Sequence, residues 1–289
     1  MKFGRTYELS VETSDNEHVV ITMPYTIEFD VKRQWLASAN ASTIRIYNLG
    51  KDTRNRLYKD VYQTTTWRAL QLRAGYENFP LPLIFNGNVQ WCYSYRQGVD
   101  FVTEIFGYDG GFAMANGFSA MTLAAGQTQR QVLQKLVADL PNTYGTAIIG
   151  TFDQVAPRGD VLFGNSWSLV NERSGGKCTI DNGQVKILND SEVISGQIPL
   201  ISSETGLLGS PMRADAVVET RLLFEPRLTL GQQVELRSTT NDYLNGQRKV
   251  MGISHRGKIS PDTGGEAVTV ASLGFGTQAL NLISGQPYQ

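Results

Sequence analysis

The chain has 289 residues, of which 41% are hydrophobic and 18% are charged, so it is long enough for two or three domains with sizeable cores. Its formal net charge of −1 argues against a protein that binds nucleic acid by neutralising phosphates, since that mode needs a strongly basic face. The two cysteines, Cys92 and Cys178, are too few for a disulfide framework or a cysteine zinc site, and we expect two small buried side chains.

The sequence carries no membrane or export signal. No apolar run is long enough to cross a bilayer as a helix, and the first ten residues, MKFGRTYELS, lack the apolar centre of a signal peptide. We therefore expect a protein that is made in the cytoplasm, does not insert into a membrane and stays soluble until it assembles.

The first hundred residues have the pattern of antiparallel strands. Apolar and polar residues alternate over 3–11 and 25–31, and the β-branched segment 43–48 predicts a third strand. A helix is expected over 51–62, capped by Asp52 or Thr53. Further strands are expected at 70–74, 83–85, 89–95 and 99–106, with Asn86-Gly87 and Gln97-Gly98 as turns.

The composition changes at Asp109-Gly110-Gly111, which we interpret as a linker into a small α/β module. Thr128 and Gln131 form a capping-box pattern and predict a helix over 128–140, which Pro141 ends. A second helix is expected over 166–174. Strands over 177–180 and 184–188 flank Asp181-Asn182-Gly183, which is a strong hairpin signal.

From residue 200 onwards the pattern is again that of strands, expected at 218–224, 233–237, 251–255 and 267–275, with a tail over 278–289 held weakly or by a partner. Gly206, Gly209 and Pro211 predict a turn with positive φ that then straightens. We expect Leu207 and Leu208, between the two glycines, to plug the core of a barrel or of a neighbouring subunit.

No catalytic, cofactor-binding or metal-binding residue is expected. His18 lies in a polar loop and His255 in a strand, and neither is near a nucleophile elbow. The 206–209 segment lacks the lysine of a phosphate loop, and the 109–111 segment lacks the oxygen ligands of a calcium loop. The tryptophans suit core and interface positions better than sugar or base stacking; they are Trp35, Trp67, Trp91 and Trp167.

Five segments in order resemble phage baseplate hub proteins, the tail-tube-like hubs of contractile-tail phages. They are ASTIRIYNLGKDTRNRLY, LIFNGNVQWCYSYRQGVDFVTEIFGYDGG, GQTQRQVLQKLVADLP, DVLFGNSWSLVNERSGGKCTIDNGQVKIL, and the set ETGLLGSP, LLFEPRLTLGQQVEL and NGQRKVMGISHRG. Each segment alone is weak, but the ordered set covers most of the chain. One departure is Glu225, which stands before Pro226 where the family usually has asparagine.

The resemblance implies a mainly β fold with two tail-tube-like antiparallel barrels, at 1–108 and 201–289, and an inserted α/β domain at 109–200. It implies a non-enzymatic homotrimer in the virion, a pseudo-six-fold ring that adapts the six-fold tail tube to the three-fold spike. The expected partners are tube or tube-initiator proteins above, the spike below, other baseplate proteins, and DNA that passes through the lumen without sequence-specific binding.

Two other classes remain open on the sequence. A carbohydrate- or receptor-binding tail module would need exposed tryptophans in a groove. A tail-associated peptidoglycan hydrolase would need a carboxylate pair or a nucleophile and base, and the many carboxylates here stand in no recognisable context.

Overall fold

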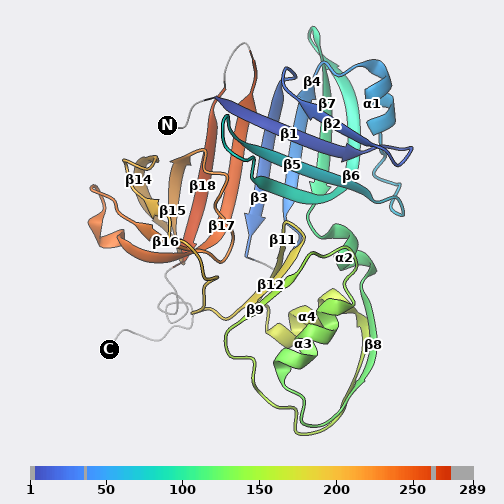
Figure 1. Ribbon diagram of the computed structural model, residues 1–289, viewed down its shortest axis with the longest axis vertical. Coiled ribbons are helices and arrows are strands. Elements are labelled where there is room, and N and C mark those ends of the chain that lie inside the picture. The colour runs from blue at the N-terminus through green and yellow to red at the C-terminus, as the bar shows by residue number, and fades with distance from the viewer. Residues whose placement is uncertain (1–3, 36–37, 262–264, 275–289) are drawn as a thin grey trace.

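The computed structural model describes residues 4–35, 38–261 and 265–274. The protein is mainly β, as predicted: one large, mostly antiparallel sheet carries a smaller region with helices below it in the view of Figure 1. No helix in the described ranges is long and apolar enough to span a membrane. The predicted tail at 278–289 and the last residue of the predicted strand 267–275 lie outside the described residues.

The N-terminal part is built from seven strands and one helix around a first hydrophobic core. These elements are β1 (Arg5–Glu12), β2 (His18–Thr22), β3 (Ile27–Gln34), β4 (Ala41–Tyr47), α1 (Lys51–Leu57), β5 (Arg68–Tyr76), β6 (Leu83–Gln97) and β7 (Asp100–Tyr108). Along β3 the odd-numbered residues are buried and the even-numbered ones are not, which is the period of two expected for one core face and one open face.

The middle part has its own core, in which α3 and α4 pack beside two small sheets. Its elements are α2 (Gly111–Asn116), β8 (Phe118–Leu123), α3 (Gln129–Ala138), β9 (Thr146–Ile149), β10 (Asp160–Asn165), α4 (Ser166–Ser174), β11 (Cys178–Asp181) and β12 (Gln184–Leu188). The sheets are β8–β10, which is antiparallel, and β11–β12–β9, in which β12 and β9 are parallel.

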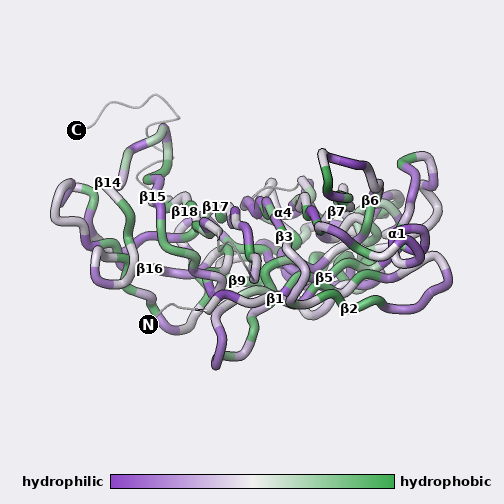
Figure 2. The backbone as a smooth tube through the Cα atoms, turned by 90° about the horizontal axis from the view of Figure 1, so that it is seen from above, coloured by the Kyte–Doolittle hydropathy of each residue, from purple (hydrophilic) through white to green (hydrophobic). Residues whose placement is uncertain are grey.

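The C-terminal part surrounds a third core. Its elements are β13 (Leu200–Ile201), β14 (Leu207–Ala214), β15 (Val217–Leu223), β16 (Gln233–Leu236), the short 3₁₀ helix η1 (Asp242–Leu244), β17 (Gly246–Ile259) and β18 (Ala267–Gly274). In Figure 2 the apolar segments follow the strands, while the loops around the margin are mostly hydrophilic.

One sheet runs through both β parts in the order β14-β15-β18-β17-β3-β4-β7-β6-β5-β1-β2. Strand β17 joins them, because its first residues pair with β16 and the segment from Gly252 to Ile259 pairs with β3. Phe224, Ile259 and Ala267 are also buried in the first core. The N-terminal strands are therefore completed by residues of the C-terminal part of the chain.

Several local predictions are confirmed. The Thr128 side chain accepts from the Gln131 amide while the Gln131 side chain accepts from the Thr128 amide, so the capping box forms as read. Helix α4 spans the predicted 166–174 and ends at Gly175 in the left-handed conformation. Both cysteines are buried and free. Asn182 and Gly183 have positive φ in the turn between β11 and β12.

The turn predicted at Asn86-Gly87 is wrong. Strand β6 continues through it as one 15-residue strand, while Gln97-Gly98 does turn the chain into β7. A Cβ on Gly87 would overlap the carbonyl oxygen of Tyr108, so the glycine serves a close approach of two backbones. An Asn-Gly pair signals a turn only when the following backbone is free to leave the sheet.

Three further predictions need correction. Helix α1 ends at Leu57 instead of residue 62, and its N-cap is Gly50 without a side-chain hydrogen bond. Its end is set by Lys59, whose backbone pairs with that of Cys92 in β6. The segment 109–111, predicted as a linker, instead holds the buried Asp109 and leads directly into α2. The strands β8, β9 and β10 were not predicted from the sequence.

The turn predicted over 206–211 forms only at its start: residues 203–206 turn the chain, and from Leu207 onwards it is in β14, which contains a bulge. Gly206 and Gly209 have positive φ, as predicted, but both Gly209 and Pro211 lie within β14, whose register shifts between Leu208 and Met212. Leu207 packs against the third core. Leu208 is half-buried, so within one chain it does not plug a core.

Candidate functional site

Neither histidine has the setting of a catalytic base. His18 was predicted in a polar loop but is the exposed first residue of β2, with Nδ1 3.4 Å from the Ser10 hydroxyl. His255 is fully buried in β17; its Nδ1 lies 2.9 Å from the Thr269 hydroxyl and its ring packs edge-on against Phe224. Burial lowers the pKa of His255 to about 3, and the nearby Arg33 charge acts in the same direction, so the ring is neutral.

The predicted hairpin 178–188 forms a joint between the middle part and the N-terminal sheet. Both oxygens of the Asp109 carboxylate accept hydrogen bonds from the backbone amides of Asn182 and Gly183 at the hairpin tip. The Asn182 side chain donates to the Leu83 carbonyl oxygen, and the Asn86 side chain donates to the Asn182 carbonyl oxygen. The tip is thus held by strand β6 and by Asp109, the residue directly after β7.

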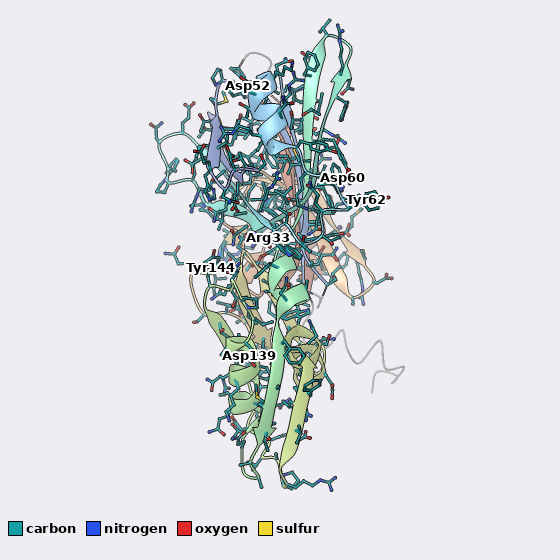
Figure 3. All side chains as sticks on the ribbon, turned by 90° about the vertical axis from the view of Figure 1, so that its right-hand side faces the viewer. Arg33, Asp52, Asp60, Tyr62, Asp139 and Tyr144 are labelled. Atoms are coloured by element: carbon teal, nitrogen blue, oxygen red, sulfur yellow. The ribbon has the colours of Figure 1, made fainter. Side chains whose placement is uncertain are left out.

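An ion-paired triad centres on Asp181, the last residue of β11, directly before the tip of the same hairpin. Asp181 on β11 accepts from the Arg33 guanidinium of β3 at 2.6 and 2.9 Å and from the Lys186 ammonium of β12 at 2.6 Å. Arg33 and Asp181 side chains are each 1% exposed. Figure 3 places Arg33 at mid-height, between the strands above and the helical part below. Lys186 also donates to the Leu230 carbonyl oxygen, which brings in the C-terminal part.

The pKa values of the two buried carboxyls are shifted in opposite directions, although burial raises both. For Asp109, burial raises the pKa well above its usual range and the Asp181 charge adds to this, while the two amide donors oppose it. For Asp181, burial would raise the pKa, but Arg33 and Lys186 hold it well below its usual value. Asp181 is therefore ionised, and the joint is an ionic connection among all three parts of the chain.

The open face of the large sheet carries a second group of charged residues, the ion-paired face. These are side chains of opposite sign. The β3–β17 register sets two of the pairs, the β4–β7 register sets a third, and the fourth joins β15 to the residue before β18. Arg45 Nε lies 3.0 Å from Glu104 Oε2, Arg256 Nε lies 3.0 Å from Asp30 Oδ2, Lys258 Nζ lies 3.2 Å from Glu28 Oε1, and Arg221 pairs with Glu266. A shallow hollow of about 580 Å³ lies between them.

The tryptophans differ in exposure. Trp35 and Trp167 are 9% and 7% exposed and belong to two different cores, so they offer no stacking surface. Trp91 is half-buried and stacks on Tyr93 and Phe106 with ring centroids 5.3 and 5.5 Å apart. Trp67 packs edge-on against Phe112. A sugar-binding groove of exposed tryptophans is therefore not formed by these residues.

Metal chemistry has no support in the described ranges, where no group of three or more His, Cys, Asp or Glu side chains could hold an ion. Both cysteines are poor ligands and nucleophiles as they stand, because burial raises the pKa of Cys92 to about 12 and that of Cys178 to about 11. The main polar features of the described residues are the ionic joint and the broad charged sheet face.

Residues 8–256 match the family described as baseplate hub gp41. The chain belongs to this family. It is therefore a structural component of a phage tail baseplate, as the ordered motifs predicted. A search of curated protein sequences finds no match.

Solved structures of tail proteins share the fold at low sequence identity. A tail protein from Neisseria meningitidis MC58 aligns with a TM-score of 0.63 and 10% identity, over 94% of this chain and 97% of that one. The 43 kDa tail protein of prophage MuSo2 from Shewanella oneidensis aligns with a TM-score of 0.57 and 9% identity, over 92% and 97%.

A third similar structure comes from E. coli and is described as a component of the type VI secretion system that resembles the T4 bacteriophage tail proteins gp27 and gp5. It aligns with a TM-score of 0.55 and 8% identity, over 88% of this chain and 75% of that one. At these identities the likeness concerns the fold alone.

The sequence predicted the hairpin, but neither the ionic joint at Asp181 nor the ion-paired face was predicted from it. The alternation Glu28, Asp30, Lys32 shows that these residues share one side of a strand. Their partners Arg256 and Lys258 lie over 220 positions away, and only the strand register brings them together. A signal for the joint exists in Asp181, the one charged residue of β11, at its C-terminal end.

Proposed function

We propose that three copies of this chain form a pseudo-six-fold ring at the baseplate hub, which adapts a six-fold tail tube above to a three-fold spike below. The observation that carries the proposal is the single sheet that passes through two β cores in each chain. Three chains then supply six similar β units, while the symmetry of the whole stays three-fold.

The proposed domains are 1–108 and 201–289 as the two barrels and 109–200 as the inserted module. Three separate hydrophobic clusters support this division. The shared pairing of β3 with β17 makes the two barrels a single rigid body in the ring. The ionic joint of Arg33, Asp181 and Lys186 then holds the module at a fixed angle to them.

The ring is proposed to close through strand edges. Among the described strands, β14 and β2 stand at the two ends of the sheet order and each pairs with one neighbour only. An unpaired edge is a liability that a neighbouring subunit removes. We place the ion-paired face on the channel side, where DNA passes without sequence-specific contacts.

In this account the protein is made in the host cytoplasm, joins the virion with tube or tube-initiator proteins, the spike and other baseplate proteins, and has no enzymatic activity. The burial of His255 and the isolation of His18 support the last point. Purified protein is expected to release no soluble products from peptidoglycan. Hydrolysis that is lost in a His18→Gln or His255→Gln variant would contradict it.

The direct test is assembly. Purified chain, mixed with the tube and spike proteins of the same phage, is expected to elute with them as a complex that holds three copies. A chain that is monomeric alone but forms the ring when tube and spike proteins are added also agrees with the proposal, since such rings can form during assembly. A chain that stays monomeric at high concentration and also forms no ring with its partners would refute it.

A further inference from the structure

In three of the four ion pairs that define the ion-paired face, the cation is the more exposed partner; in Arg221–Glu266 the carboxylate is more exposed, at 70% against 56%. The side-chain exposures are 45% for Arg45 over 16% for Glu104, and 59% for Arg256 over 35% for Asp30. The exposure of Lys258 is 41%, over 31% for its partner Glu28. A large ligand that touched the face over these three pairs would meet the positive groups first.

The two signs balance across the face. Five basic side chains and five acidic ones point outward from β15, β17, β3, β4, β7 and the residue before β18. The basic ones are Lys32, Arg45, Arg221, Arg256 and Lys258, and the acidic ones are Glu28, Asp30, Glu104, Glu219 and Glu266. Strand geometry spreads them over a broad surface, in contrast to a compact basic patch.

Cations of this kind would bind a polyanion strongly if they were free. Each phosphate that a lysine or arginine neutralises releases condensed counterions, and this release drives non-specific affinity for DNA. A carboxylate within about 3 Å of the same cation competes with the phosphate for it. The paired cations can thus orient toward a passing phosphate without holding it.

We propose that the ion-paired face is a charge-masked guide for double-stranded DNA, in which Glu28, Asp30 and Glu104 keep the affinity of the outer cations for phosphate low. The inference rests on the proposed channel for its biological setting. The masking itself is a property of the single chain and is measurable without a ring.

The test compares the binding of a fluorescent 30-base-pair duplex by the full-length wild type and by Glu28→Gln/Asp30→Asn/Glu104→Gln. The wild type is expected to show no saturable binding at 150 mM salt. The variant frees the three cations that are paired within 3.2 Å, which are Arg45, Arg256 and Lys258. Its affinity for DNA should therefore exceed that of the wild type, and should fall about 40-fold when the salt is raised from 50 to 200 mM, for a slope of about −2.7. Equal binding by both proteins would overturn the proposal.

The matched control removes three carboxylates from exposed ion pairs elsewhere, as Asp15→Asn/Glu17→Gln/Asp160→Asn. It changes the net charge equally and is expected to bind DNA no better than the wild type. Binding as strong as that of the first variant would show a mere net-charge effect and overturn the masking. If the triple variant is unstable, Glu28→Gln/Asp30→Asn should also bind DNA more tightly than the wild type, with a salt slope of about −1.8.

A second measurement separates this inference from the hub proposal. Particles that carry the triple variant are expected to assemble in normal number but to eject their DNA more slowly. Normal ejection would overturn the guide, whereas absence of the chain from particles of either genotype would overturn the hub proposal and leave the DNA-binding comparison standing.

Discussion

Replacing Arg33 by alanine should destabilise the protein more than any change of an exposed ion pair. The substitution leaves Asp181 buried at 1% exposure with Lys186 as its remaining cation. Removing one partner of a buried pair costs about 3–5 kcal/mol, because the other charge stays desolvated and uncompensated. The retained contact to Lys186 at 2.6 Å puts the expected loss near the lower end, about 3 kcal/mol.

The loss is measured by urea unfolding, with hydrogen exchange at the amides of Asn182 and Gly183 as a local readout. Both amides donate to Asp109, and they should exchange faster once the hairpin loosens. Arg56→Ala is the control, since its carboxylate partners are exposed and its cost should stay below about 1 kcal/mol. A loss in Arg33→Ala no larger than in this control would refute the joint.

Three further predictions concern single positions. Gly87→Ala should lower yield and thermal stability sharply, because the added Cβ overlaps a backbone carbonyl, whereas Gly50→Ala has open space and should be tolerated; equal behaviour of both would contradict the close approach. The free energy of unfolding should fall as the pH drops from about 6.5 towards 3, because the His255 ring takes up a proton only in the unfolded chain. His255→Gln should weaken this dependence on pH, and His18→Gln should not. An equally strong dependence on pH in both variants would contradict burial of a neutral ring. Gly209→Val should cost about 1–3 kcal/mol by thermal unfolding, since the native φ is +69°, and no loss would exclude that conformation.

Local signals predicted the parts of the fold that depend on neighbours in sequence. The capping box at Thr128 and Gln131 forms as read because both hydrogen bonds span three residues. The period-two pattern predicted which residues of β3 face the core, and its odd-numbered residues are buried. The hairpin at Asn182-Gly183 is similarly local, because positive φ at both residues suits them.

Long-range pairing explains what sequence reasoning missed. Asn86-Gly87 has a turn signal, yet its backbone is needed where β6 approaches β7, and β6 continues straight. The 109–111 segment has the composition of a linker, but Asp109 is buried because the hairpin tip, more than 70 positions later, supplies two amide donors. The joint and the ion-paired face each consist of residues from strands far apart in the sequence, so no single segment predicts either of them.

The copy number and symmetry of this chain in the assembled tail tip test the central claim most directly. Electron microscopy of intact tail tips should resolve one ring of three copies, three times the 31.9 kDa of a single chain, with two β units per copy and the ion-paired face on the channel. Six copies in the ring, or density for this chain only at the periphery of the baseplate, would contradict the account.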